Sequence, residues 1–347
     1  MKLLTTTGFK NIDDIVVGDS LIHEDSTTSL VTEKTPSDKV KYLLTMQDGT
    51  EITLTDQVDI EYHVARSGRK PKIKSIQEAL VQFNKQVLRG PQQDNNIPKL
   101  ITKLVTPVTF GAKDSNLLVD PYTLGAVLGD GCITQNTCKV TSADYQIIAN
   151  IEKAGYVCNV HKDKQGDNAA KDYCVIGLAK VLKEYNLIGC NSYSKFIPPE
   201  YLMASVEDRF AIVQGLMDTD GYIDDGGSTE FCTISPQLKD GIRYLLQSLG
   251  FTVTVSEKKP FYRDKHGDRV AGQLAYNLYI RGNDQGQLFR LDRKLDRVKS
   301  KRCGNRIDQM VVLGESSTCE IFTESNKPVL AEGFIPVFLR KKGNYDR

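Results

Sequence analysis

The middle of the chain, from about residue 118 to about residue 300, shows the same order of predicted elements twice. Residues 118–200 predict a helix, two strands, a helix, two strands and a helix, and residues 201–302 predict that order again. Two copies of one αββαββα unit favour a pseudo-twofold arrangement, in which each copy presents the same surface to a shared partner. The predicted fold class is therefore α+β.

Each copy opens with a helix whose smallest residues recur every four positions. The first helix reads LGAVLGDG, with Gly125 and Gly129, and the second reads AIVQGLMDTDG, with Ala211, Gly215 and Thr219. Residues four apart lie on one helix face, and small side chains there let two backbones approach closely. We therefore expect the two helices to pack against each other along these residues.

Both helices end on an Asp-Gly pair, at Asp130 and Asp220. Packing the helices together would bring two carboxylates to two helix C-termini, where like charge and the helix dipoles are both unfavourable. A divalent cation would offset both, and Mg²⁺ is predicted because it takes carboxylates and keeps waters for a substrate phosphate. Backbone carbonyls of Gly129 and Thr219 could add ligands. The alternative is that each pair is only a helix C-cap turn with Gly in the left-handed region.

The motifs LGAVLGDG and VQGLMDTDG resemble the two signature helices of LAGLIDADG homing endonucleases, in the form that carries both in one chain. The resemblance covers residues 118–300. It implies that Asp130 and Asp220 bind catalytic metal ions, that the sheets straddle double-stranded DNA, and that cleavage across the minor groove leaves short 3′ overhangs. One chain then holds both halves of the site, so we expect a monomer acting on a long, nearly non-palindromic target.

The resemblance also implies a catalytic lysine. KFIP, at Lys195 just before the second helix, is similar to a family element whose Lys assists catalysis. In metal-assisted phosphodiester hydrolysis, metal ions lower the pKa of a bound water and neutralise charge on the phosphate. Lys195 would orient or polarise that water, or stabilise developing negative charge. Its counterpart in the second copy lies near Lys294 or Lys299, and a loose alignment ranks Lys299 first.

Basic side chains on the strands are the candidates for contacts in the major groove, where base edges are read. They are Lys139, Lys162 and Lys164 in the first copy and Lys258, Lys259, Arg263 and Arg281 in the second. The segment SEKKPFYRDKHGDRVAG, from Ser256, predicts a long hairpin tip that reaches along the duplex. The alternative is a surface loop.

The charge distribution supports nucleic-acid binding only locally, because the net charge of the whole chain is +1. A basic stretch from Arg66 to Arg89 crowds together Arg69, Lys70, Lys72 and Lys74. We expect residues 66–117 to form a basic segment that contacts DNA phosphates. The alternative is a solvated linker.

Other features of the sequence restrict the class of protein. The eight cysteines contain no C-x-x-C pair, so neither a zinc site nor a disulfide framework is predicted. The longest apolar runs are much shorter than a membrane span. We therefore expect a protein of the cytoplasm, or of the nucleus in a eukaryote.

The two ends of the chain resemble the halves of a Hint domain, the hedgehog/intein fold of protein splicing. TTGFKNIDDIVVGDSLI, from Thr6, is similar to its start, and CEIFTESNKPVLAEGFIPV, from Cys319, is similar to its last strands. We expect residues 1–65 and 303–338 to form one β-rich domain, followed by a basic tail at 339–347.

Splicing requires a first Cys or Ser, a T-x-x-H element and a final His-Asn, and none of these is found. The chain starts at Met1, the T-x-x-H position reads TDQV with Val58, and the terminal pair is Val337-Phe338. We therefore predict that splicing is absent; His63 replaces the missing His only if the strand register slips. Two other functions stay open: a nuclease-inactive nucleic-acid-binding protein, such as a regulator or RNA maturase, and a splicing-competent intein with altered ends.

Overall fold

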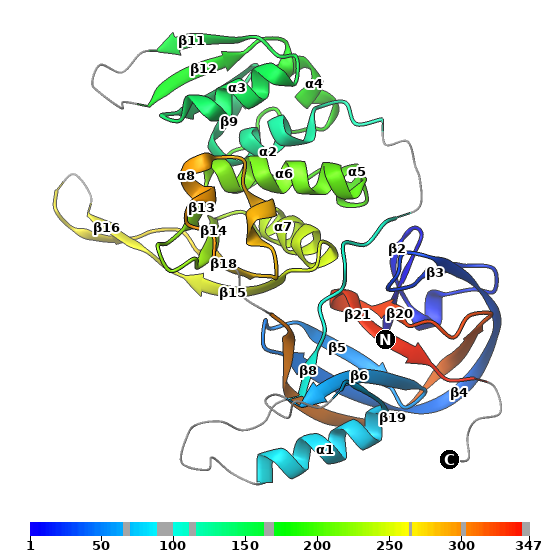
Figure 1. Cartoon of the computed structure of the whole chain (residues 1–347). Helices are drawn as coiled ribbons and strands as arrows, with labels where there is room; N and C mark the ends of the chain where they lie inside the picture. The colour runs from blue at the N-terminus through cyan, green and yellow to red at the C-terminus, as the bar shows by residue number, and fades with distance from the viewer. Residues whose placement is uncertain are drawn as a thin grey trace. The chain divides into compact units, whose positions relative to one another are not determined.

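The computed structural model describes residues 1–64, 70–88, 100–110, 116–162, 170–263, 266–299 and 303–341. The chain divides into two compact units. The first unit consists of Met1–Gly111 and Cys303–Arg347, and the second consists of Ala112–Arg302. The first unit is therefore built from both ends of the chain, whereas the second is continuous (Figure 1).

The first unit is rich in β structure. Its 11-stranded sheet has the order β19-β8-β6-β21-β20-β1-β3-β4-β5, with β2 paired to β1 and β7 paired to β6. The strands are β1 (Lys2–Thr5), β2 (Gly8–Asn11), β3 (Ser20–Ile22), β4 (Thr28–Met46), β5 (Glu51–Thr55), β6 (Val58–Val64), β7 (Lys72–Ser75), β8 (Leu100–Thr102), β19 (Asn305–Thr323), β20 (Val329–Ala331) and β21 (Ile335–Leu339). The helical elements are η1 (Ile12–Asp14), α1 (Ile76–Leu88) and η3 (Glu332–Phe334).

A long antiparallel ribbon joins the two ends of the chain. β4 and β19 pair from Val31 opposite Thr323 to Met46 opposite Ile307. Alternate residues of the ribbon face one core, so that Met46 and Ile307 are buried in the same cluster. Residues from opposite ends of the sequence thus depend on each other for burial.

The predicted basic segment, residues 66–117, is partly built into the first unit. β7 extends the sheet, and Ile76 and Ala79 of α1 lie in its core. The start of α1 is a capping box, because the Ser75 hydroxyl accepts from the Glu78 backbone N–H at 3.1 Å and the Glu78 carboxylate accepts from the Ser75 N–H at 3.3 Å. The first unit therefore continues past the boundary predicted at residue 66, and α1 packs its apolar face into the core of that unit.

The predicted tail, residues 339–347, also starts too early. Leu339 is still in β21, opposite Val58 of β6. The Arg340 backbone N–H continues this pairing by donating to the Gln57 carbonyl at 3.1 Å. Residues 342–347 lie outside the described part of the chain.

The second unit contains both repeats. The first repeat is α2 (Pro121–Asp130), β9 (Gly131–Gln135), β10 (Thr137–Ser142), α3 (Tyr145–Lys153), β11 (Cys158–Lys162), β12 (Lys171–Val175) and α4 (Leu178–Glu184), followed by α5 (Pro199–Leu202). The second repeat is α6 (Val206–Thr219), β13 (Gly221–Ile223), β14 (Thr229–Thr233), α7 (Pro236–Ser248), β15 (Thr252–Lys258), β18 (Ala275–Arg281), η2 (Gln285–Leu288) and α8 (Asp292–Leu295). The predicted element order is present in the first repeat. In the second, η2 and the short α8 stand where one longer helix was expected.

Each repeat contributes one four-stranded sheet. The strand orders are β11-β12-β10-β9 and β13-β14-β18-β15. Between β15 and β18, β16 (Phe261–Arg263) and β17 (Arg269–Ala271) pair with each other and project from the second sheet (Figure 1). The hairpin predicted from the sequence is therefore present.

The two motif helices, α2 and α6, form the centre of the second unit. Asp120 caps α2 by accepting from the Thr123 N–H at 2.8 Å, and Ser205 caps α6 by accepting from the Asp208 N–H at 3.0 Å. A Cβ atom on Gly125 would lie 2.1 Å from the Ile212 carbonyl oxygen. The predicted close packing of these helices along their small residues is therefore confirmed.

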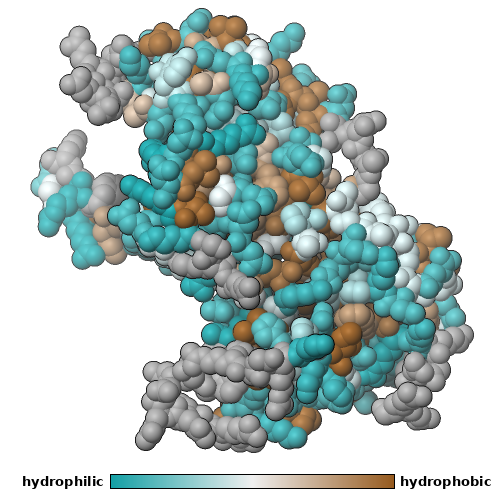
Figure 2. All heavy atoms as spheres, viewed as in Figure 1, coloured by the Kyte–Doolittle hydropathy of each residue, from teal (hydrophilic) through white to brown (hydrophobic). Residues whose placement is uncertain are grey.

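Hydrophilic residues cover most of the face drawn in Figure 2. Within the described ranges, no helix has the length and apolar character needed to cross a membrane.

Candidate functional site

The close packing of α2 and α6 brings Asp130 and Asp220 together at the ends of the two helices. Their carboxyl groups lie within hydrogen-bonding reach of each other, so that the ionisation of one affects the other. Burial raises the pKa of Asp130; burial, together with the charge of Asp130, raises the pKa of Asp220 to about 6. Both residues still have part of their surface open to solvent. The helix ends thus form one accessible acidic site.

The glycines after the two acids are required for steric reasons. A Cβ on Gly131 would lie 2.2 Å from the Val127 carbonyl oxygen, and one on Gly221 would lie 2.5 Å from that of Met217. Gly131 has φ −81°, and Gly221 is not among the glycines with positive φ. The alternative of left-handed glycine caps is therefore wrong: the chain turns directly from each helix into a strand.

Lys195 lies against the end of α2. Its ammonium nitrogen, Nζ, donates to the carbonyls of Val127, Gly129 and Gly131 at 3.2, 2.7 and 2.8 Å. The side chain is buried, and burial lowers its pKa although the charges of Asp220 and Asp130 raise it. The three N–H donors are thus used by carbonyls at a helix C-terminus. In this arrangement Lys195 caps α2 and offsets the negative end of its dipole, rather than offering a free donor to a water.

Lys294 makes the equivalent contacts at the end of α6. Its Nζ donates to the carbonyls of Met217, Asp218 and Gly221 at 2.6, 2.9 and 2.6 Å. Burial lowers its pKa to about 8. Lys299 is exposed. The ranking of Lys299 over Lys294 is therefore wrong, because the turn of α8 directs Lys294 inward, and the spacing of basic residues alone did not reveal this.

Of the two proposed carbonyl ligands, that of Gly129 already has a partner. The Gly129 carbonyl accepts from Lys195. The Thr219 hydroxyl donates to the Gly215 and Leu216 carbonyls, both at 2.9 Å. Among the described residues no group of three or more His, Cys, Asp and Glu could hold a metal ion. The Asp130–Asp220 pair fits a hard divalent cation, which would take its remaining ligands from water or from a substrate phosphate.

The basic candidates of the first repeat lie in or after its sheet. Lys139 of β10 pairs with Cys132 and Cys174, on the face opposite to the buried Val140 and Tyr173. Lys162 is in β11, in register with Asp172. Lys164 lies outside the described residues.

The basic candidates of the second repeat lie at strand ends and on the hairpin. Lys258, Lys259 and Arg281 are exposed. Arg263 of β16 donates to the Gly267 carbonyl at 2.8 Å. Among the described residues, no hydrogen bond or ion pair joins any of these four side chains to Asp130 or Asp220.

The exposed sheet face of the second repeat also carries residues that the sequence analysis did not single out. Tyr222, Glu230 and Tyr279 are cross-strand neighbours on β13, β14 and β18. Tyr222 and Tyr279 are 53% and 39% exposed, which is unusual for large aromatic side chains. The alternation of buried and exposed residues in EFCTIS was the signal that could have located this face.

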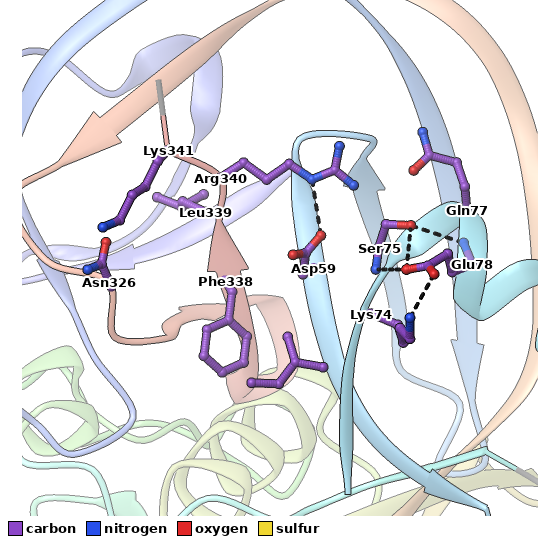
Figure 3. A pocket seen from close by; sticks show the side chains of 11 residues that line it. Asp59, Lys74, Ser75, Gln77, Glu78, Asn326, Phe338, Leu339, Arg340 and Lys341 are labelled. Carbon is purple, nitrogen blue, oxygen red and sulfur yellow. Dashed lines mark hydrogen bonds and ion pairs between the residues drawn. The ribbon is translucent and has the colours of Figure 1, made fainter. Parts of the chain in front are cut away.

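The basic candidates of the first unit lie around β7. Lys70 and Lys72 are exposed, whereas Lys74 is 2.8 Å from Glu78 in an ion pair. Arg69 lies outside the described residues. A pocket of about 750 Å³ beside β7 is lined on one side by Lys74 and Glu78 and on the other by Arg340, which points toward Asp59 at 3.1 Å (Figure 3). Acids in the pocket thus pair with these two cations, and Lys341 lines it as well.

Comparison with known proteins gives matches of two kinds in sequence. A family model described as a LAGLIDADG-like domain matches residues 207–290, which begin in α6 and end before α8. A protein named Replicative DNA helicase DnaB, from Mycobacterium intracellulare, is 29% identical over an alignment of 311 residues that covers 84% of this chain and 48% of that protein. The chain thus spans about half the length of this relative.

Among solved structures, the crystal structure of I-DmoI in complex with DNA and Mn matches with a TM-score of 0.28 and 13% sequence identity, over 47% of this chain and 89% of that one. The homing endonuclease I-WcaI bound to its DNA recognition sequence matches with a TM-score of 0.32 and 12% identity, over 63% of this chain and 99% of that one. By the family model, the second repeat of this chain carries a LAGLIDADG-like domain.

Proposed function

We propose that the chain is a metal-dependent endodeoxyribonuclease that cuts both strands of a long, nearly non-palindromic DNA target across the minor groove, and that it works as a monomer. The observation that supports this most strongly is the pair Asp130 and Asp220, whose carboxyl groups meet at the ends of two closely packed helices. The match of residues 207–290 to a LAGLIDADG-like domain agrees with this chemistry.

In this proposal the two acids hold divalent ions, and Mg²⁺ is our candidate. When bound, the ions supply Lewis acidity and a water of lowered pKa for attack on the phosphodiester. Both carboxyl groups would be ionised when they hold the ions. Lys195 and Lys294 neutralise the carbonyls at the two helix ends, so that the acids keep their position beside the scissile phosphates.

The sheet faces opposite the core would read the bases. Lys139 in the first sheet and Arg281 in the second extend from those faces, and Lys258, Lys259 and Arg263 would follow the phosphate backbone along the hairpin.

The first unit is, in this proposal, a Hint-like domain that no longer splices. Val58 is fully buried in its core, and Val337 pairs with Ile60, so neither position offers a group that activates an amide. His63, the other candidate for the missing histidine, lies in β6 opposite Ile101 of β8. The alignment with 48% of a DnaB helicase is what an element inserted in a host protein would give. Lys70 and Lys72 would add contacts to DNA phosphates.

The nuclease is tested with the full chain. Footprinting on genomic DNA locates the bound target, and a plasmid that carries it is then incubated with Mg²⁺. We expect linear product from the wild type and none from Asp130→Asn or Asp220→Asn, with DNA binding retained.

Asp240→Asn is the matched control, because Asp240 also precedes a glycine but pairs with Lys239 on the surface. Cutting that survives both acid substitutions would exclude the proposed site. Binding without cutting by the wild type would favour the regulator or maturase. Ligation of flanking segments after a first Cys and a final His-Asn are restored would favour the intein.

A further inference from the structure

Asp218 is a buried acid that the proposed mechanism does not use. It lies in α6, two residues before Asp220, and its side chain faces away from the acid pair's solvent-open side and into the core. Its carboxylate accepts from the Tyr122 hydroxyl at 2.9 Å and from the backbone N–H groups of Arg290 and Leu291 at 3.1 and 3.2 Å. The last two residues immediately precede α8.

The surroundings of Asp218 hold it in this place. A buried carboxylate is tolerated only when hydrogen bonds satisfy it, and the three donors do so. Tyr122 receives a further hydrogen bond from Asn150 at 3.3 Å, and the Arg290 guanidinium lies 4.3 Å from the centre of the Tyr122 ring. The network therefore joins both repeats to the segment at 290–291.

This segment determines where Lys294 can reach. Lys294 follows Leu291 by one helical turn, and its backbone N–H donates to the Leu291 carbonyl at 3.0 Å. Its Nζ then returns to the end of α6, where one of its three acceptors is the Asp218 carbonyl itself. Asp218 thus contacts both the base of α8 and the tip of the Lys294 side chain.

The first repeat has no such acid. The residue two positions before Asp130 is Leu128, which is buried. Lys195 is anchored instead by the Ser235 hydroxyl, which donates to the Lys195 carbonyl at 2.6 Å while it caps α7 by accepting from the Leu238 N–H at 3.1 Å. The two lysines make equivalent contacts but are supported by different side chains.

We propose that Asp218 is the positioning residue for Lys294 and Ser235 the positioning residue for Lys195, so that each supports one half of the acid site and the cutting of one DNA strand. This rests on the proposed nuclease function. Loss of Asp218 frees the start of α8, Lys294 leaves the end of α6, and the carbonyls beside Asp220 lose their neutralising charge.

The first measurement does not depend on cutting. The folded chain is treated with an amine-acylating reagent, and the labelling of each lysine is measured by peptide mass spectrometry. In Asp218→Asn we expect faster labelling of Lys294 than in the wild type, with Lys195 unchanged. In Ser235→Ala we expect the reverse. If neither lysine becomes more reactive, or if both do so in each variant, the assignment is overturned.

The second measurement follows each strand of a doubly labelled target duplex in single-turnover cutting. Loss of a side chain that orients a metal site lowers activity about 10–100-fold. We expect a loss of this size on one strand in Asp218→Asn, on the other in Ser235→Ala, and less than about twofold on the remaining strand.

Tyr122→Phe removes one donor to Asp218 and is the milder variant if Asp218→Asn does not fold. It is expected to slow the same strand as Asp218→Asn, by a smaller factor. Equal slowing of both strands in these variants would overturn the proposal. A wild type that cuts neither strand would refute the nuclease itself, while the labelling result would still decide the role of Asp218.

Discussion

The two repeats of the second unit share their backbone contacts but not the side chains that support them. Lys195 and Lys294 each donate to three carbonyls at the end of a motif helix. Behind Lys294 lies a buried carboxylate, Asp218, whereas behind Lys195 lies a hydroxyl, Ser235. The symmetric part of the site is therefore the neutralisation of two helix ends by lysine. The side chains that hold each lysine in place differ between the repeats.

The largest effect is expected where the repeats touch. Gly125→Ala would place a methyl group 2.1 Å from the Ile212 carbonyl oxygen, and Gly215→Ala would place one 2.1 Å from that of Tyr122. Each should destabilise the second unit by about 3 kcal/mol or more, because two backbones must separate. Hydrogen exchange of α2 and α6 measures this. Gly286→Ala is the control, because the nearest atom to its new methyl group would be at 3.4 Å. Unequal losses of stability in Gly125→Ala and Gly215→Ala would show that the two repeats contribute unequally to the interface.

The next effect tests the correspondence between the lysines. Lys294→Met and Lys195→Met each remove three hydrogen bonds from a buried ammonium group to carbonyls at a helix end, and each should lower the cutting rate at least about tenfold. Lys299→Met should change it less than about twofold, because that residue is exposed. Single-turnover cutting rates, measured with enzyme in saturating excess over DNA, compare the three variants. A larger loss from Lys299→Met than from Lys294→Met would break the correspondence.

The pH dependence of stability sharpens the comparison of the two acids. The folded-state pKa of Asp220 is raised from 3.8 to about 6, so between these values the folded chain binds more protons than the unfolded chain. The contribution of Asp220 to stability therefore falls as pH rises from about 4 to about 6 and is constant above that. With a chelator present to remove divalent ions, the difference in melting temperature between Asp220→Asn and the wild type should grow as pH rises from about 4 to about 6. A difference that is independent of pH would mean that the pKa of Asp220 is not raised in the folded chain.

The smallest effects compare the first unit with the second. Lys70→Gln and Lys72→Gln should each lower the slope of log affinity against log salt by at most about 0.9, because each removes one phosphate contact. Lys74→Gln should lower it less, because Glu78 pairs with Lys74. DNA affinity measured from low to moderate salt tests this. If all three slopes equal that of the wild type, the basic segment is not a DNA contact.

Much of the second unit follows from local sequence. The order of elements in the first repeat, the pairing of α2 with α6 and the meeting of Asp130 with Asp220 were all predictable from periodicity and from the positions of small residues. The start of α1 could also have been predicted, because Ser75 and Glu78 have the spacing of a capping box. The capping of α6 by Lys294 could not be predicted from local sequence, because its acceptor Met217 is 77 residues away.

Local periodicity is enough to predict which helices pair and which acids end them, because a helix repeats every 3.6 residues and its face of small residues appears within a short stretch. How those acids are supported depends instead on contacts between distant segments. Whether Lys294 or Lys299 turns inward, and whether Asp218 is buried, depends on where α8 crosses the end of α6. That crossing is set by packing between distant segments, which leaves no periodic trace in either of them.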